Sequence, residues 1–273
     1  MNNLFSFILF FLILFTGCRP KERVLGVVLA GHAYGQPLEK TLGLHPPLKE
    51  YLKNEPNDLV FFLGDFVRYP CLKSFEFLKT EIKGLKIENK FVPGNHDVID
   101  SMLYKKYIGD RFYSYETKGV KFVVLDGNIN EWNIIDEQLS FLKQELAHFE
   151  GKVFILVHQI IWIDGEDYSY VQSNSKSGKA KDLNFWSDVF PLLDKYNNDV
   201  FVCAGDLGAF KMITNPIYDK KSNVHLIGTG MGARYRDNCI QVNVFEGGEV
   251  ELEVVSLQPG LDFGYLEDYS PSN

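Results

Sequence analysis

The sequence predicts an α/β fold in which mixed β-sheets are flanked by helices within one domain. Two observations predict it. Apolar strand-like runs alternate with amphipathic stretches over the first two thirds of the chain, and hairpin-like strands dominate the last third. The chain has 273 residues, of which 45% are hydrophobic, and it shows neither an internal repeat nor an interdomain linker.

The first half of the chain is expected to alternate strands with helices. Pro46 favours a helix start, and the Lys118-Gly119 pair favours a tight turn between two strands. The expected elements are strand 24–30, helix 46–55, strand 58–65, helix 74–84, strand 88–97 and the hairpin 111–127.

The second half begins with a clear amphipathic helix that is capped near Asp136. Pro191 is expected to disturb the next helix, and Gly247-Gly248 to turn the last hairpin. The expected elements are helix 136–149, strand 152–158, the loop 165–182, helix 184–196, strand 199–206 and strand 223–228. The tail after 258 reads as irregular.

The charge balance excludes one class of partner. The formal net charge is −8, and no cluster of Lys and Arg stands out. Binding to a phosphate backbone needs such a basic patch, so no nucleic acid partner is expected.

The N-terminus has the features of an export signal. An uncharged apolar run over 4–15 has the length of a signal-peptide core, and LFTGC at 14–18 resembles a bacterial lipobox. That resemblance implies removal of residues 1–17, lipid on Cys18 and a tether over 18–23. The alternative is an uncleaved anchor. Either interpretation places the protein in the bacterial cell envelope, membrane-anchored and facing the periplasm or the surface.

The remaining cysteines are three, an odd number: Cys71, Cys203 and Cys239. Cys203 and Cys239 lie in strand-like runs and are interpreted as small buried hydrophobes, so no disulfide is expected.

Polar side chains follow five successive strands at the point where each strand ends. The carboxyl ends of strands are where α/β folds gather functional groups, and three polar groups in a row would be costly to bury without a ligand. The strand-end segments are AGH ending at His32, GDFVR from Asp65 to Arg68, GNHD with Asn95 and His96, LVH ending at His158, and GDLG with Asp206.

This ordered series resembles the motifs of the calcineurin-like metallophosphoesterases, over roughly residues 24 to 255. The resemblance implies a four-layer α/β/β/α sandwich of two mixed sheets, with a phosphoesterase domain over 24–258 and a tail over 259–273. It also implies divalent cations that clamp a phosphate and generate a hydroxide nucleophile.

The resemblance assigns a role to each matching residue. Asp65 takes the position that bridges two cations, and Asn95 and His158 complete one metal site. His96 assists the leaving oxygen or steadies the phosphate, and Asn95 also lies where substrate binds. Arg68 contacts the phosphate or pairs with Asp97.

Two positions depart from the family pattern. Ala30 stands where the first motif has Asp, and Asp206 stands where the last motif has His. One metal site therefore has Asp65, Asn95, His158 and Asp206, whereas the other has only His32 and the shared Asp65. Exchanging an imidazole for a carboxylate favours Mn²⁺, Fe²⁺ or Mg²⁺ over Zn²⁺, as one or two ions.

Other side chains are open to two interpretations. Asp126 either supplies the second metal site or caps a turn, and His225 is a core or near-site histidine. His45 and His148 are expected on the surface. Four aromatic residues either wall a substrate pocket or belong to the core: Trp162, Tyr168, Tyr170 and Trp186.

Two functions follow. The first is an exported, membrane-tethered phosphoesterase that hydrolyses phosphomonoesters or phosphodiesters of a small molecule or envelope component. The second is a degenerate phosphoesterase fold retained as a binding or scaffold protein of the cell envelope, suggested by the incomplete metal site.

Overall fold

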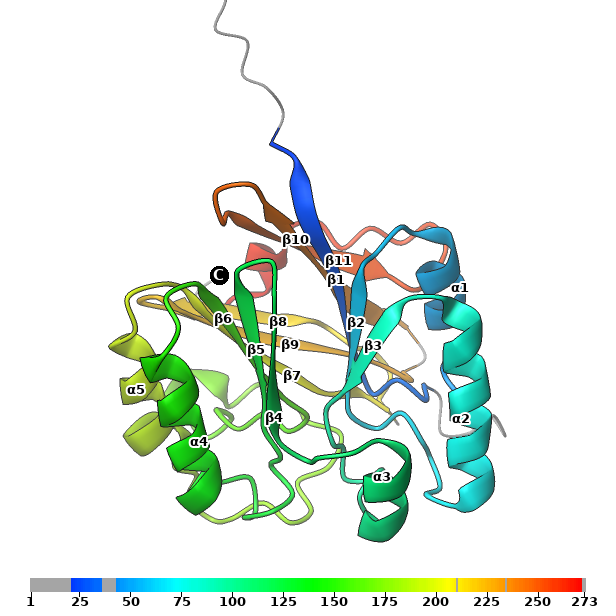
Figure 1. Ribbon diagram of the computed structural model, residues 1–273, viewed down its shortest axis with the longest axis horizontal. Helices are drawn as coiled ribbons and strands as arrows, with labels where there is room; N and C mark the ends of the chain where they lie inside the picture. The colour runs from blue at the N-terminus through cyan, green and yellow to red at the C-terminus, as the bar shows by residue number, and fades with distance from the viewer. Residues whose placement is uncertain (1–20, 36–42, 210, 234, 272–273) are drawn as a thin grey trace, which may run out of the picture.

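Short apolar runs form the strands, and they assemble into two sheets. The computed structural model describes residues 21–35, 43–209, 211–233 and 235–271. Each sheet is covered on its outer face by helices, so the layers follow the order α/β/β/α (Figure 1). This confirms the predicted fold class.

The first sheet has the order β11-β10-β1-β2-β3. Strands β1, β2 and β3 are parallel, whereas β10 pairs antiparallel with both of its neighbours, β1 and β11. The strands are β1 (Arg23–Gly31), β2 (Leu59–Leu63), β3 (Glu88–Phe91), β10 (Asn238–Phe245) and β11 (Val250–Ser256).

The second sheet has the order β4-β5-β6-β7-β9-β8. Strands β5, β6, β7 and β9 are parallel, and an antiparallel strand closes each edge. The strands are β4 (Tyr113–Thr117), β5 (Val120–Val124), β6 (Lys152–Val157), β7 (Val200–Gly208), β8 (Ile217–Lys221) and β9 (Val224–Met231).

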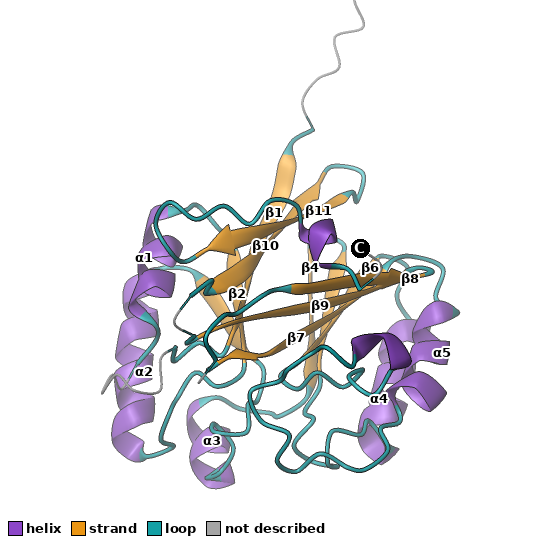
Figure 2. Cartoon of the chain, turned by 180° about the vertical axis from the view of Figure 1, so that it is seen from behind, coloured by secondary structure: helices purple, strands orange, loops and turns teal. Residues whose placement is uncertain are grey.

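Three apolar layers hold the sandwich together. The middle layer joins the two sheets and contains a row of stacked rings, Phe122, Phe154 and Phe201. The outer layers lie under the helices (Figure 2). The α-helices are α1 (Pro46–Asn54), α2 (Leu72–Leu85), α3 (Ser101–Tyr107), α4 (Asp136–Ala147) and α5 (Phe190–Asp194).

The structure differs from the expected elements in several places. Strand β8 was not predicted. Helix α3 was not predicted, because its seven residues are too few to show a helical period. A π-helical turn (Phe185–Val189) precedes α5 and places Pro191 in the first turn of the new helix, where its missing N–H costs nothing. The tail contains a 3₁₀ turn (Leu266–Tyr269) whose Leu266 is buried against the core.

The export signal, with its cleavage after residue 17 and the lipid site Cys18, lies outside the described residues. Within the described residues, no helix has the length and apolar character needed to cross a membrane. Cys71, Cys203 and Cys239 are all free thiols, and the last two are buried as expected.

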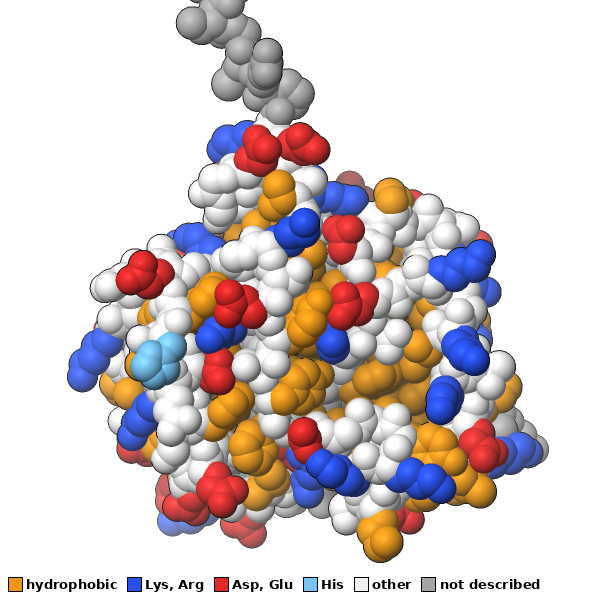
Figure 3. Space-filling model, viewed as in Figure 1, with side chains coloured by type: hydrophobic (Ala, Val, Ile, Leu, Met, Phe, Trp, Pro, Cys, Tyr) orange, Lys and Arg blue, Asp and Glu red, His pale blue; other side chains and the backbone are white. Residues whose placement is uncertain are grey.

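The face shown in Figure 3 carries interspersed acidic and basic side chains. A hollow between α2, β3 and α3 is lined by apolar side chains and has a volume of about 120 Å³. It contains none of the strand-end polar residues that the sequence singles out.

Candidate metal and phosphate site

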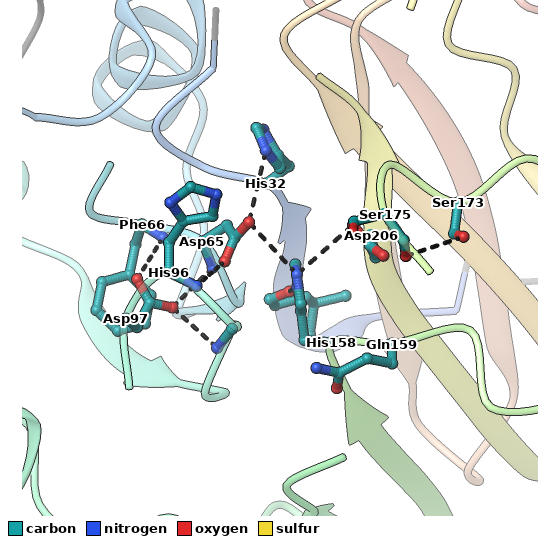
Figure 4. Close-up of polar contacts among 12 residues, drawn as sticks. His32, Asp65, Phe66, His96, Asp97, His158, Gln159, Ser173, Ser175 and Asp206 are labelled. Atoms are coloured by element: carbon teal, nitrogen blue, oxygen red, sulfur yellow. Dashed lines mark hydrogen bonds and ion pairs between the residues drawn. The ribbon is translucent and has the colours of Figure 1, made fainter. Parts of the chain in front are cut away.

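Glycines let the two sheets touch at their shared carboxyl edge. A Cβ on Gly31, at the end of β1, would lie 2.6 Å from the Cα of Gly205 in β7. A Cβ on Gly64, after β2, would lie 2.4 Å from the His158 ring. Only glycine allows such an approach. The strand ends of different sheets therefore deliver their side chains into one place (Figure 4).

Asp65 lies at the centre of this site and is buried. Its Oδ1 accepts the backbone N–H of His96 at 3.0 Å. Its Oδ2 lies 3.6 Å from Nε2 of His32 and 3.5 Å from Nε2 of His158. One oxygen is thus fixed, and the other faces an imidazole on each side (Figure 4). This is the arrangement expected of a bridging carboxylate.

His158 and Asp206 form the second-sheet half of the site. The Nδ1–H of His158 donates to the Leu63 carbonyl at 2.8 Å, which fixes the ring. Its Nε2 lies 3.7 Å from Oδ1 of Asp206, and neither atom has a hydrogen-bond partner among the described residues. The predicted fold and site both require these two residues to lie close together, because metal–ligand bonds are only about 2.0–2.6 Å long. The structure places them in contact.

His32 forms the other half together with Asp65. Ala30, two residues earlier, is fully buried in the apolar layer under α1 and α2, so that position offers no carboxylate. Ala30 therefore adds no ligand beside His32 and Asp65.

Asp97 organises the loop that carries the phosphate-binding candidates. Its carboxylate accepts the backbone N–H groups of Asp65, Phe66, Val67 and Gly94 at 2.7–3.0 Å. Burial and the neighbouring Asp65 charge raise the pKa of Asp97 to about 8, and these N–H donors act in the opposite direction.

His96, Asn95 and Arg68 lie around this loop. The Nδ1–H of His96 donates to the Arg68 carbonyl at 2.9 Å, which leaves Nε2 available. Asn95 and His96 are half-buried, and the Arg68 guanidinium lies 5.0 Å from the centre of the Tyr69 ring. His96 is tied to Asp65 through its backbone N–H. All three side chains are open to solvent in part.

The charges of the site are tightly coupled. Burial lowers the pKa of His158, but the Asp65 and Asp206 carboxylates outweigh burial and raise it to about 10. Burial raises the pKa of Asp65, yet the imidazoles of His158 and His32 hold it well below its usual range. Burial raises the pKa of Asp206 to about 7 and lowers that of His32 to about 4. The site gathers carboxylates that need a positive partner.

The donors fit a divalent cation in their chemistry. Nε2 of His158 and Oδ1 of Asp206 are buried and have no hydrogen-bond partner among the described residues. With the imidazole neutral, both atoms offer a lone pair that a cation would satisfy. The Leu63 carbonyl supports the His158 ring as outer groups support metal-binding histidines. Across the described ranges, however, no group of three His, Cys, Asp or Glu side chains is arranged to hold an ion.

Several candidates lie elsewhere. Asp126 accepts from Arg111 and from Asn128, so it is a turn carboxylate and does not complete the metal site. His225 contacts Tyr218 and Asp199 near the opposite edge of the second sheet.

The prediction that His45 lies on the surface is wrong, because this residue is buried. Its Nε2 pairs with Asp237 at 3.3 Å, and it ties the segment before α1 to the loop after β9. His148 is exposed as expected.

Three of the four aromatic candidates pack against the outer core of the second sheet. Trp162 and Tyr168 are fully buried, and Trp186 stacks on Tyr168 with ring centres 5.6 Å apart. Tyr170 is half exposed and lines a groove of about 560 Å³ that also includes Leu207 and Gly208, directly after Asp206.

One residue near the site was missed. Tyr34 lies two residues after His32, is buried, and packs against the rings of His32 and His96. The signal was present in the sequence, because the segment AGHAYG continues past a strand end into the same loop.

Comparison with known families decides the classification. The family model described as calcineurin-like phosphoesterase matches residues 38–193, which is more than half of the chain. The chain belongs to the calcineurin-like phosphoesterase family. The matched segment contains Asp65, Asn95, His96 and His158, and the structure adds His32 and Asp206 from outside it.

Individual relatives are distant. A "Probable cyclic nucleotide phosphodiesterase" of Fibrobacter succinogenes is 26% identical over 126 residues, which cover 44% of this chain and 48% of that protein. The match therefore spans about half the length of this relative.

Two solved structures are similar to this chain over most of its length, at low identity. A conserved uncharacterised protein of Streptococcus pneumoniae is 12% identical with a TM-score of 0.39, covering 87% of this chain and 94% of that chain. Vacuolar Protein Sorting 29 of Cryptosporidium parvum is 11% identical with a TM-score of 0.44, covering 88% and 95%.

Proposed function

We propose that this protein is a metal-dependent phosphoesterase that hydrolyses phosphomonoesters or phosphodiesters. The observation that carries the proposal is the geometry of Asp65, whose free oxygen lies 3.5–3.6 Å from two buried imidazoles of different strand ends. A carboxylate between two sets of donors suits the bridging of cations that clamp a phosphate. Family membership supports the same reaction class.

The cofactor that best suits the donors is Mn²⁺, Fe²⁺ or Mg²⁺, as one or two ions. His158, Asp206, Asp65 and Asn95 would hold the first ion, and His32 with Asp65 would hold a second one more weakly. A bound divalent ion supplies positive charge for the phosphoryl oxygens and lowers the pKa of water. Three of the first site's four donors are oxygen groups, which favours these ions over Zn²⁺.

The chain's own residues would bind and orient the substrate. Arg68 offers a guanidinium to the phosphoryl oxygens, and Asn95 offers its amide. His96 has one ring nitrogen fixed by the Arg68 carbonyl, so its Nε2 is oriented to give a proton to the leaving oxygen or to steady the phosphate.

The substrate is a phosphorylated small molecule or envelope component. The Fibrobacter relative, by its name, acts on a cyclic nucleotide, which places diesters among the substrates to test. The groove of about 560 Å³ that includes Leu207 and Gly208, directly after Asp206, is our candidate place for an organic group of the substrate.

The cellular location we propose is the bacterial cell envelope. The motivating feature is the apolar run that ends in LFTGC, with lipid on Cys18 after removal of residues 1–17. The protein would then be an anchored lipoprotein whose domain faces the periplasm or the surface.

Turnover of aryl phosphate monoesters and diesters with added Mn²⁺ tests the activity. We expect hydrolysis by the wild-type protein, and at least about a 100-fold lower rate for Asp65→Ala, because the bridging carboxylate is lost. Metal content after purification without chelator gives a second readout. If neither substrate class is hydrolysed faster than by Asp65→Ala, the degenerate binding protein is the better interpretation.

A further inference from the structure

The Tyr34 side chain is held rigidly beside Asp65. Its backbone N–H donates to the Asp65 carbonyl at 2.9 Å, which joins the loop after β1 to the loop after β2. Its ring centre lies 4.3 Å from that of His32 and 5.4 Å from that of His96, edge to face. The ring is therefore fixed between two imidazoles of the site.

The Tyr34 hydroxyl has no hydrogen-bond partner among the described residues, although the residue is only 2% exposed. A buried hydroxyl without a partner is costly, and such groups in folded proteins usually have a ligand or water as partner. The charges that act on this hydroxyl belong to the site: Asp65, Arg68, Asp97 and Asp206.

We propose that Tyr34 is a substrate-binding residue whose Oη–H donates a hydrogen bond to a non-bridging oxygen of the bound phosphoryl group, beside Arg68 and His96. The inference rests on the proposed function, because it names a further group of that same site. It adds a neutral donor on the depleted side of the site, where Ala30 leaves His32 with Asp65 alone.

The chemistry favours an oxyanion over a cation as the partner of this hydroxyl. A tyrosine phenol has an ordinary pKa of about 10 and is therefore protonated at physiological pH. A protonated phenol is a donor, and a phosphoryl oxygen is an acceptor. Arg68 lies on the same side, and its positive charge would attract the same anion.

Tyr104 provides a matched control. It is also a fully buried tyrosine whose hydroxyl lacks a partner among the described residues, but it belongs to α3 and packs in the apolar layer with Phe66. Replacing either tyrosine by phenylalanine removes the same hydroxyl group from an equally buried position. Only Tyr34 contacts the imidazoles of the site.

The test is calorimetric binding of inorganic phosphate to the Mn²⁺-loaded protein. We expect Tyr34→Phe to weaken phosphate binding about 10- to 100-fold, as loss of a hydrogen bond to a charged acceptor would. Mn²⁺ affinity should stay within about twofold, and the Tm without ligand should be level or higher, because no protein hydrogen bond is lost. Tyr104→Phe should leave phosphate affinity unchanged.

Three results would overturn the proposal. Phosphate affinity of Tyr34→Phe within twofold of wild type, a fall in its Mn²⁺ affinity of tenfold, or a wild-type protein that binds no phosphate would each do so. Failure of the proposed function is distinguishable. If the wild-type protein binds phosphate through Tyr34 but hydrolyses no ester, the role of Tyr34 stands and the proposed enzymatic activity is wrong.

Discussion

Two residues of the site have a backbone conformation that residues other than glycine seldom adopt. His32 and Asp65 have φ angles of 54° and 52°, in the left-handed region. Each such residue costs about 1–2 kcal/mol relative to an extended or right-handed one. This conformation orients the two side chains. The backbone turns sharply at the end of each strand, so the side chain faces the other sheet. The left-handed conformation of these two residues therefore helps to set the geometry of the site.

At the same scale, Asp206 should behave as a cation ligand. We expect Asp206→Asn to weaken Mn²⁺ binding at least about tenfold, because the cation loses one of few donors. Without metal, the free energy of unfolding should be level or rise, because Asp206 no longer adds negative charge beside Asp65. Calorimetric titration and denaturant unfolding measure the two effects.

Asp126→Asn is the matched control for Asp206→Asn. Asp126 is an equally buried carboxylate, but it pairs with Arg111 outside the metal site. Its loss should leave Mn²⁺ affinity unchanged and cost about 1–3 kcal/mol of stability, because a buried charge pair is broken. Unaltered Mn²⁺ affinity in Asp206→Asn would make that residue a turn carboxylate.

At the scale of the elements, the site depends on strand ends from two sheets meeting backbone to backbone. A Cβ on Gly205 in β7 would lie 2.1 Å from the Leu63 carbonyl oxygen at the end of β2. The contacted atom belongs to the backbone and cannot move aside as a flexible side chain does. A side chain at position 205 would therefore force one sheet to shift. Since His158 and Asp206 come from one sheet and His32 and Asp65 from the other, such a shift separates the halves of the site.

Gly205→Ala should therefore damage stability and binding together. We expect a loss of about 1–3 kcal/mol in the free energy of unfolding, as for other overpacked cores, with weaker Mn²⁺ binding. Gly84→Ala in α2 is the control, because a Cβ there meets nothing within 4 Å. Helix propensity should make Gly84→Ala neutral or stabilising by up to about 1 kcal/mol. Equal stability of the two variants would show that the close approach does not constrain the sheets.

The sequence predicts elements well where a period or a breaker marks them. The runs that became β1, β2, β6 and β7 are continuous and apolar, and their polar ends identify the site edge. Short α3 has no such signal. Burial of His45 depends on Asp237, which is distant in sequence, and the order of strands in the two sheets depends on long-range pairing. Tyr34 looks like any core aromatic until its ring contacts are known.

At the scale of the whole molecule, the site lies far from the end of the chain that would be anchored. Strand β1 has nine residues, begins at Arg23 and ends one residue before His32. At a rise of about 3.3 Å per residue, it separates the two ends by about 30 Å. With lipid at Cys18 and a tether of a few residues, we expect the site to lie at the end of β1 that is away from the membrane.

Replacing Cys18 by alanine tests anchoring independently of the site. Because the described fold begins beyond the tether and the site lies at the opposite edge, Cys18→Ala should keep the same Tm and the same Mn²⁺ affinity. We expect loss of lipid labelling, accumulation of the unprocessed chain and a changed membrane fraction, measured in cells by radiolabelled palmitate and fractionation. Cys71→Ala, at an exposed free thiol of the folded domain, is the matched control and should be processed normally.

If processing and membrane fractionation of Cys18→Ala equal those of wild type, the chain is not a lipoprotein.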